Sequence, residues 1–316
     1  MRRSPNHAVQ LRLAGSVAFR GVESDGEMMV DRGDGVQLWA QVSGSTTGTP
    51  LLLVMGANAS GVAWPQELLD RLGAVHRVIR YDHRDTGRST WAFEEQPYAI
   101  RDLADDAVAV LDAFGVERAH VVGMSMGGTL VQLLLLDHPD RLDSATVFCT
   151  AALEFGLSAG DGSVDDLPGP DPRLLEKWES MGEPRDPAAE LAWRIDHWRL
   201  LNGDALPFDE MEFRRLEQAV IDHSGRADSP VAHALADQGG LDRGDELARV
   251  DVPALVIEAP ADPINPPPHA AHLARVVNGA RLVTIPGMGH ALGEPVVAPL
   301  AEAILEFTTD IDRSTT

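Results

Sequence analysis

The sequence predicts an α/β fold in which a mostly parallel central sheet is flanked by helices and carries an inserted helical cap. Two observations predict it. Short apolar runs alternate with longer amphipathic segments along most of the chain, and this alternation stops once, between about Ala151 and Val250. Alternating strands and helices form βαβ units, whose helices cover both faces of a parallel sheet.

The expected strands are short apolar runs that read as buried, at residues 51–55, 76–81, 119–123, 145–149, 254–258 and 280–285. An earlier strand at 36–42 is expected in a leading hairpin. The expected helices have the longer amphipathic pattern and lie at 65–72, 102–114, 126–137, 268–277 and 296–307.

Four parts of the chain are expected. Residues 28–150 and 251–316 form the two parts of the core, and residues 151–250 form the helical cap. Helical stretches at 174–181, 187–201 and 209–223 contain Trp178, Trp193 and Trp198, which are expected mainly in the interior of the cap. Residues 1–27 carry four arginines and lack the uninterrupted apolar centre of a signal peptide, so they are expected to be a flexible extension.

The composition limits the partners. With 26 Lys and Arg against 49 Asp and Glu, the formal net charge is −23, which repels nucleic acids and anionic membranes. The apolar run 133–136 is far shorter than the ~20 residues that span a bilayer. Cys149 is the single cysteine, so it forms no internal disulfide and is expected to be a buried small hydrophobe. Such cysteine usage is compatible with a cytoplasmic protein.

The strongest motif is Gly-Met-Ser-Met-Gly at residues 123–127, between an expected strand and an expected helix. This G-x-S-x-G context is typical of a tight turn that presents a nucleophilic serine at the edge of the sheet. The glycines avoid clashes in the turn, and the following helix directs its free N–H groups toward the same place. The sequence therefore predicts Ser125 as a nucleophile.

A serine hydroxyl needs a base to take its proton. His290 is the best candidate among 11 histidines, because it follows the last expected strand in a glycine-containing loop. His83 precedes the serine, out of order for this kind of fold, and His138 lies beside a proline at a helix end, where a capping role is simpler. We therefore expect His290 to be the base.

The third member is an acid that orients the imidazole. Asp262 follows the expected strand at 254–258 and lies between the serine and the histidine in the chain. Glu258 is its main rival but belongs to the strand itself. The resulting order of serine, aspartate and histidine favours Asp262.

Two backbone donors are expected to hold the oxyanion. One is the N–H of Met126, which follows the nucleophile. The other comes from the small-residue loop at 55–61, where Ala57 is favoured while Gly56 and Asn58 stay open. The polar run at 81–89 is interpreted mainly as a network that braces the neighbouring catalytic turn, ahead of a direct contact with substrate.

Four stretches carry a family resemblance, at residues 51–56, 80–89, 120–127 and 285–292; they read LLLVMG, RYDHRDTGRS, HVVGMSMG and IPGMGHAL. They resemble α/β-hydrolase-fold esterases, and most closely the aclacinomycin methylesterase family of anthracycline biosynthesis. The likeness runs from about residue 30 to 307 and includes cap stretches at 198–200 and 221–223. One departure is Ala57, where related loops often carry glycine.

The resemblance implies an α/β-hydrolase fold, a triad of Ser125, Asp262 and His290, and Met126 with Ala57 as oxyanion donors. It also implies a small-molecule carboxylic ester as substrate, including the methyl ester of a polyketide, with no metal or organic cofactor. Perhydrolysis, C–C bond hydrolysis or acyl transfer on the same triad is the main alternative. A binding protein without turnover is the second, and homo-oligomer formation stays open.

Overall fold

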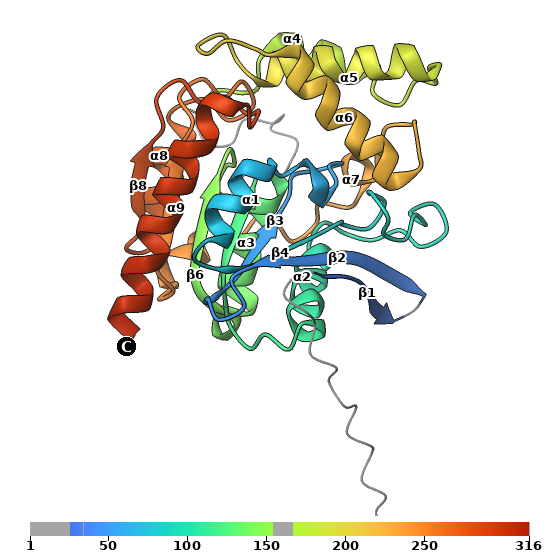
Figure 1. Ribbon diagram of the computed structural model, residues 1–316. Coiled ribbons are helices and arrows are strands. Elements are labelled where there is room, and N and C mark those ends of the chain that lie inside the picture. Colours follow the sequence, from blue (N-terminus) through green and yellow to red (C-terminus); the bar gives the residue numbers. More distant parts are fainter. Residues whose placement is uncertain (1–25, 34, 154–166, 316) are drawn as a thin grey trace, which may run out of the picture.

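The computed structural model describes residues 26–33, 35–153 and 167–315, and within them lies one sheet of eight strands (Figure 1). The strands in chain order are β1 (Gly26–Gly33), β2 (Val36–Gly44), β3 (Pro50–Val54), β4 (Arg77–Tyr81), β5 (Ala119–Met124), β6 (Leu142–Phe148), β7 (Ala254–Glu258) and β8 (Arg281–Thr284). Their order across the sheet is β1-β2-β4-β3-β5-β6-β7-β8. Pairing from β4 to β8 is parallel, whereas β1 and β2 are antiparallel.

Helices cover both faces of the sheet. Helix α1 (Gln66–Gly73) packs beside α9 (Glu294–Thr315) on one face, while α2 (Asp102–Ala113), α3 (Met126–Asp137) and α8 (His269–Val276) share the other. The alternation of side chains along β3 explains the two cores: Leu51 and Leu53 pack with α1 and α9, whereas Leu52 packs with α2 and α3. The expected mostly parallel α/β-hydrolase architecture is therefore confirmed.

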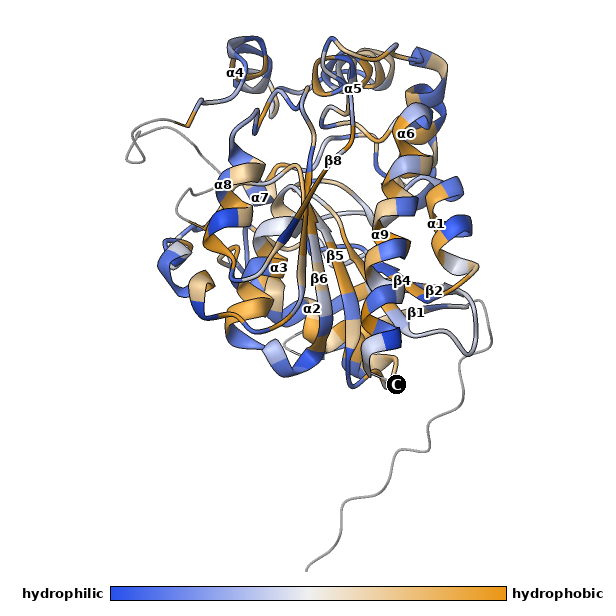
Figure 2. Ribbon diagram, turned by 90° about the vertical axis from the view of Figure 1, so that its left-hand side faces the viewer, coloured by the Kyte–Doolittle hydropathy of each residue, from blue (hydrophilic) through white to orange (hydrophobic). Residues whose placement is uncertain are grey.

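The helices inserted between β6 and β7 lie over one edge of the sheet (Figures 1 and 2). They are α4 (Pro172–Glu179), α5 (Pro187–Leu201), α6 (Glu210–Ser224) and the short α7 (Ala232–Leu235). Asp171, Asp186 and Asp209 each cap one of the first three by accepting backbone N–H groups, which fixes where these helices begin. We call α4 to α6 the cap helices.

Two features differ from expectation at the sheet's ends. The leading hairpin is longer than expected, because Gly26 and Glu27, assigned to the extension, pair with Val42 and Gln41 of β2. The last strand, expected to be buried, is exposed along its whole length as an edge strand, with Leu282 43% exposed. Most of the predicted N-terminal extension lies outside the described residues. No described helix is long and apolar enough to cross a membrane.

Candidate functional site

Ser125 occupies a strained turn between β5 and α3. Its φ of 55° and ψ of −124° are values that side-chain-bearing residues rarely adopt. Glycines make the turn possible: a Cβ on Gly123 would lie 2.3 Å from the Gly127 carbonyl oxygen, and one on Gly127 would lie 2.0 Å from the Val54 carbonyl oxygen. The pattern predicted from residues 123–127 is therefore a real strand-to-helix elbow.

The elbow presents Ser125 beside the loop that follows β3. The Ser125 side chain is half-buried, and a Cβ on Gly56 would lie 3.1 Å from the Ser125 Cβ and 3.6 Å from its hydroxyl oxygen. Glycine at this position thus lets the loop backbone pass directly alongside the serine. The Ser125 N–H donates to the Phe148 carbonyl at the end of β6, at 3.0 Å.

His290 and Asp262 form a buried pair. His290 Nδ1 lies 2.9 Å from Asp262 Oδ1 and 3.1 Å from Oδ2. Asp262 Oδ1 also accepts the N–H groups of Ile264 and Asn265, at 2.8 and 3.2 Å. Burial disfavours the charged carboxylate, but His290 and these two donors outweigh it and hold the pKa of Asp262 below its ordinary value. Asp262 is therefore placed to be an ionised partner of the imidazole.

The loop carrying His290 is attached to the cap. The His290 N–H donates to the carbonyl of Leu201, the last residue of α5, at 2.7 Å. A Cβ on the preceding Gly289 would lie 2.1 Å from the Asn202 carbonyl oxygen, so only glycine allows this approach. The position of the imidazole thus depends on the end of a cap helix.

Cys149 links the serine side of the site to this pair. It directly follows Phe148, which accepts the Ser125 N–H, and its thiol lies within 4.8 Å of the polar atoms of both Asp262 and His290. Burial and the nearby Asp262 carboxylate raise the pKa of the Cys149 thiol, so it is a neutral filler rather than a nucleophile. Its burial matches expectation, but its proximity to the pair could not be anticipated from its place after an apolar run.

The structure brings Asp262 and His290 into direct contact and places Ser125 at the same edge of the sheet. Among the described residues, no hydrogen bond joins Ser125 to His290. Such contacts are often long in an unliganded site and tighten when the substrate arrives.

The sequence-level rivals are engaged elsewhere. His83 is buried and its Nε2 bonds to the Met55 carbonyl at 3.0 Å. His138 bonds through Nε2 to Asp105 at 2.9 Å near the surface. Glu258 accepts from the Thr284 hydroxyl at 2.8 Å, on the neighbouring edge strand. None of these three groups contacts the Asp262–His290 pair.

The polar run at 81–89 braces the loop after β3 more than the elbow itself. Asp82 is fully buried; its Oδ1 accepts from the Ser60 hydroxyl and from the Gly61 N–H, and its Oδ2 accepts from the Arg88 N–H at 2.8 Å. The Oδ2 atom also bonds to His223 of α6, at 2.8 Å. This carboxylate therefore joins the loop to a cap helix.

The three cap tryptophans, expected mainly in the cap interior, are only partly buried, and Trp178 and Trp198 pack against the apolar cluster of the cap. Each indole N–H donates within the cap: Trp178 to His197, Trp193 to Ser180 and Trp198 to Glu217.

Within the described part of the chain, two groups of side chains lie close enough to share a metal ion. One is Cys149, Asp262 and His290, in which the thiol is neutral and the imidazole and carboxylate bond to each other.

The other group is His76, His120 and Asp312, at the opposite end of the sheet. The ring nitrogens of His76 bond to Thr49 and Thr308, and those of His120 bond to Ser144 and Asp312. In this second group, every ring nitrogen therefore already has a protein partner.

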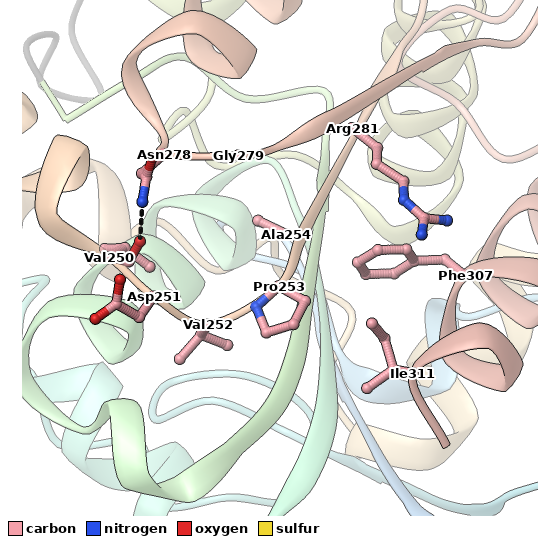
Figure 3. A pocket seen from close by; sticks show the side chains of 10 residues that line it. All are labelled: Val250, Asp251, Val252, Pro253, Ala254, Asn278, Gly279, Arg281, Phe307 and Ile311. Carbon is pink, nitrogen blue, oxygen red and sulfur yellow. Dashed lines mark hydrogen bonds between the residues drawn. The ribbon is translucent and has the colours of Figure 1, made fainter. Parts of the chain in front are cut away.

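A pocket lies away from this site (Figure 3). It is lined by Val250, Asp251, Val252, Pro253, Ala254, Asn278, Gly279, Arg281, Phe307 and Ile311. Ala254 begins β7, whereas Asp262 follows the end of β7. This pocket therefore lies at the amino ends of the strands, opposite the candidate residues. In α/β sheets, ligands bind outside the carboxyl ends of the strands, which is where the candidate residues are.

Comparisons with known proteins agree with this fold. A model of the alpha/beta hydrolase fold family matches residues 49–294. Rhodomycin D methylesterases from Streptomyces sp. strain C5 and from Streptomyces peucetius are each 47% identical over 285 residues, which is 87% of this chain and 96% of each relative.

Solved structures are similar as well. A hydrolase from Pseudomonas aeruginosa PA01 aligns with a TM-score of 0.68 and 26% identity, over 89% of this chain and 98% of its own. Est816, described as an N-acyl homoserine lactone degrading enzyme, aligns with a TM-score of 0.64 and 26% identity, over 89% of this chain and 100% of its own.

Proposed function

Because this chain belongs to the α/β hydrolase fold family, we propose that it is a serine carboxylesterase that uses Ser125, His290 and Asp262 as its triad. The enzyme is a carboxylic ester hydrolase. The observation that carries the triad is the buried Asp262–His290 pair at the sheet edge where the elbow presents Ser125.

The proposed reaction passes through an acyl-enzyme. His290 Nε2 takes the Ser125 proton as the hydroxyl oxygen attacks the ester carbonyl, and Asp262 stabilises the imidazolium that forms. The N–H groups of Met126 and Ala57 hold the oxyanion. His290 then returns the proton to the leaving alkoxide, so an alcohol departs. Water, activated by His290 in the same way, releases the carboxylic acid.

The proposed substrate is the methyl ester of a polyketide-type small molecule. Support comes from the two rhodomycin D methylesterases, which match 96% of their own length. Such a reaction would release methanol and leave a free carboxylate on the larger product. A cytoplasmic location is part of the proposal and is compatible with Cys149 being buried without a disulfide. Homo-oligomer formation stays an open prediction.

A substrate panel tests the proposal. Wild-type protein and Ser125→Ala would be assayed on methyl esters of aromatic polyketide acids, on short p-nitrophenyl esters and on lactones, with products identified by mass spectrometry. We expect the wild type to release methanol with its highest kcat/KM on the bulky methyl esters, and Ser125→Ala to be inactive. A higher kcat/KM on lactones than on methyl esters, or a product from C–C cleavage, would contradict the assignment of a methyl ester as the substrate.

A further inference from the structure

The loop after β3 is held by two buried histidines that the reaction above does not use. His83 Nε2 bonds to the Met55 carbonyl at 3.0 Å, and His233 Nδ1 bonds to the Asn58 N–H at 2.8 Å. Both side chains are fully buried, and their rings meet edge to face with centroids 5.6 Å apart. One histidine therefore fixes each end of the short segment that contains Gly56 and Ala57.

The bonds of His233 define its tautomer. Because the Asn58 N–H is a donor, Nδ1 must be the acceptor. Nε2 lies 3.0 Å from the Arg84 carbonyl oxygen, which only accepts, so Nε2 carries the proton. Burial, with a smaller contribution from His83, lowers the pKa of His233 to about 3. The ring thus stays neutral, and Nδ1 stays an acceptor, at every pH where the enzyme would work.

A second bond makes the contact reciprocal. The backbone N–H of His233 donates to the Asn58 side-chain oxygen at 3.1 Å. Asn58 has a φ of 57°, in the left-handed region, where asparagine is tolerated far better than most residues. His233 belongs to α7, so a four-residue helix beyond the cap helices clamps a turn that directly follows a core strand.

The clamp decides which N–H groups are available to a substrate. The Asn58 N–H is already used, which removes Asn58 from the three candidate oxyanion donors. Ala57 is exposed at the tip of the loop, and among the described residues neither the Ala57 nor the Met126 N–H donates to another protein group. Gly56 brings this backbone against the Ser125 side chain.

We infer that His233 is a positioning residue for the oxyanion hole: by accepting the Asn58 N–H at Nδ1, it sets the turn that leaves the Ala57 N–H free to face the substrate carbonyl oxygen. The inference rests on the proposed esterase function. His233 touches neither substrate nor Ser125 in this role, and acts only through the backbone of the loop.

Two amide variants test the hydrogen bonds of the two His233 ring nitrogens separately. In His233→Asn, the side-chain oxygen can occupy the place of Nδ1 and accept the Asn58 N–H. In His233→Gln, the amide nitrogen can reach the place of Nε2 and donate to the Arg84 carbonyl, but no acceptor remains for Asn58. Both variants keep the backbone N–H of His233, and each keeps one ring bond and loses the other: His233→Asn keeps the bond to Asn58, and His233→Gln keeps the bond to the Arg84 carbonyl.

Loss of one oxyanion donor costs about 10²–10³-fold in kcat, and a displaced donor should cost less. We expect kcat of His233→Gln to fall about 10–100-fold with little change in KM, and kcat of His233→Asn to stay within about threefold of wild type. Affinity for a trifluoromethyl ketone, whose hemiketal oxyanion occupies the same hole, should fall in parallel with kcat/KM. The corresponding variants of the surface residue His138 serve as matched controls.

Equal kcat values for His233→Asn and His233→Gln, or a better His233→Gln, would overturn the inference. If Ser125→Ala retained activity, the proposed function would fail instead, so the two failures are distinguishable. Should either variant fail to fold, ¹⁵N spectra of histidine-labelled wild-type protein give a direct reading. They should show His233 with a protonated Nε2 and a bare Nδ1, and a protonated Nδ1 would contradict the clamp.

Discussion

Asp262 Oδ1 accepts three donors at once, namely His290 Nδ1 at 2.9 Å and the N–H groups of Ile264 and Asn265. Because the two backbone donors are fixed by the turn after β7, the carboxylate cannot rotate without losing them. The orientation of the imidazole is therefore set by the backbone of one loop and by the carbonyl of Leu201 from the cap.

This relationship predicts a specific defect in Asp262→Asn. The amide oxygen should keep the two backbone donors at the place of Oδ1, which leaves the NH2 group at the place of Oδ2, 3.1 Å from His290 Nδ1. The NH2 protons oppose a proton on Nδ1 and favour the tautomer with the proton on Nε2, which cannot take the Ser125 proton, and the neutral amide no longer stabilises the imidazolium. We expect kcat to fall on the order of 10³–10⁴-fold with the fold retained, measured by steady-state kinetics and circular dichroism. Retention of more than a tenth of wild-type kcat would contradict the role of Asp262.

The elbow predicts that Gly127→Ala is strongly destabilising. The new Cβ would meet the Val54 carbonyl oxygen at 2.0 Å, so α3 must move away from β3. Overpacking of this kind costs about 1–3 kcal/mol or more, and displacement of Ser125 should abolish turnover. The matched control is Gly182→Ala, where nothing lies within 4 Å of the added carbon. Urea denaturation should show loss of stability in the first variant alone.

Much of this site could be predicted from residue patterns. The elbow is local, so the sequence of residues 123–127 suffices to predict it. Asp262 and His290 could be predicted because each lies just after a short apolar strand, in the chain order expected after the serine. The clamp could not be predicted, because Asn58 and His233 are 175 positions apart and α7 has only four residues. The exposure of β8 could not be predicted either, because an apolar pattern does not say whether a strand has one neighbouring strand or two.

The cap contains a buried charge network whose disruption should be costly. Arg194 of α5 has a side chain only 8% exposed and bonds to Glu190 and Glu217, each at 3.0 Å. Arg194→Met would leave the buried Glu217 carboxylate without its cation and would leave Glu190 paired only with Arg185, at 3.3 Å, and we expect a loss of about 3–5 kcal/mol. Arg199→Met removes an exposed pair with Glu210 and should cost at most about 1 kcal/mol. Similar values for both variants, from urea denaturation, would contradict this view of the cap.

Burial of His233 predicts a stability that falls in acid. Its pKa is about 3 in the fold against an ordinary value of 6.5. Between these values the unfolded chain binds the proton and the folded chain does not, so the free energy of unfolding rises with pH across this window and its contribution is complete above it. From pH 7 to pH 5, we expect the wild type to lose about 2 kcal/mol more than His233→Asn. An equal loss in both proteins would show that His233 titrates normally.

The central claim is that Ser125 is the nucleophile, and covalent labelling tests it most directly. Wild-type protein would be treated with a fluorophosphonate. Its intact mass would be measured by mass spectrometry, and the labelled residue would be located by peptide mapping. We predict one adduct per chain on Ser125, formed in step with the loss of esterase activity, and none on Ser125→Ala. A stoichiometric adduct on another residue, or full activity in labelled protein, would contradict the account.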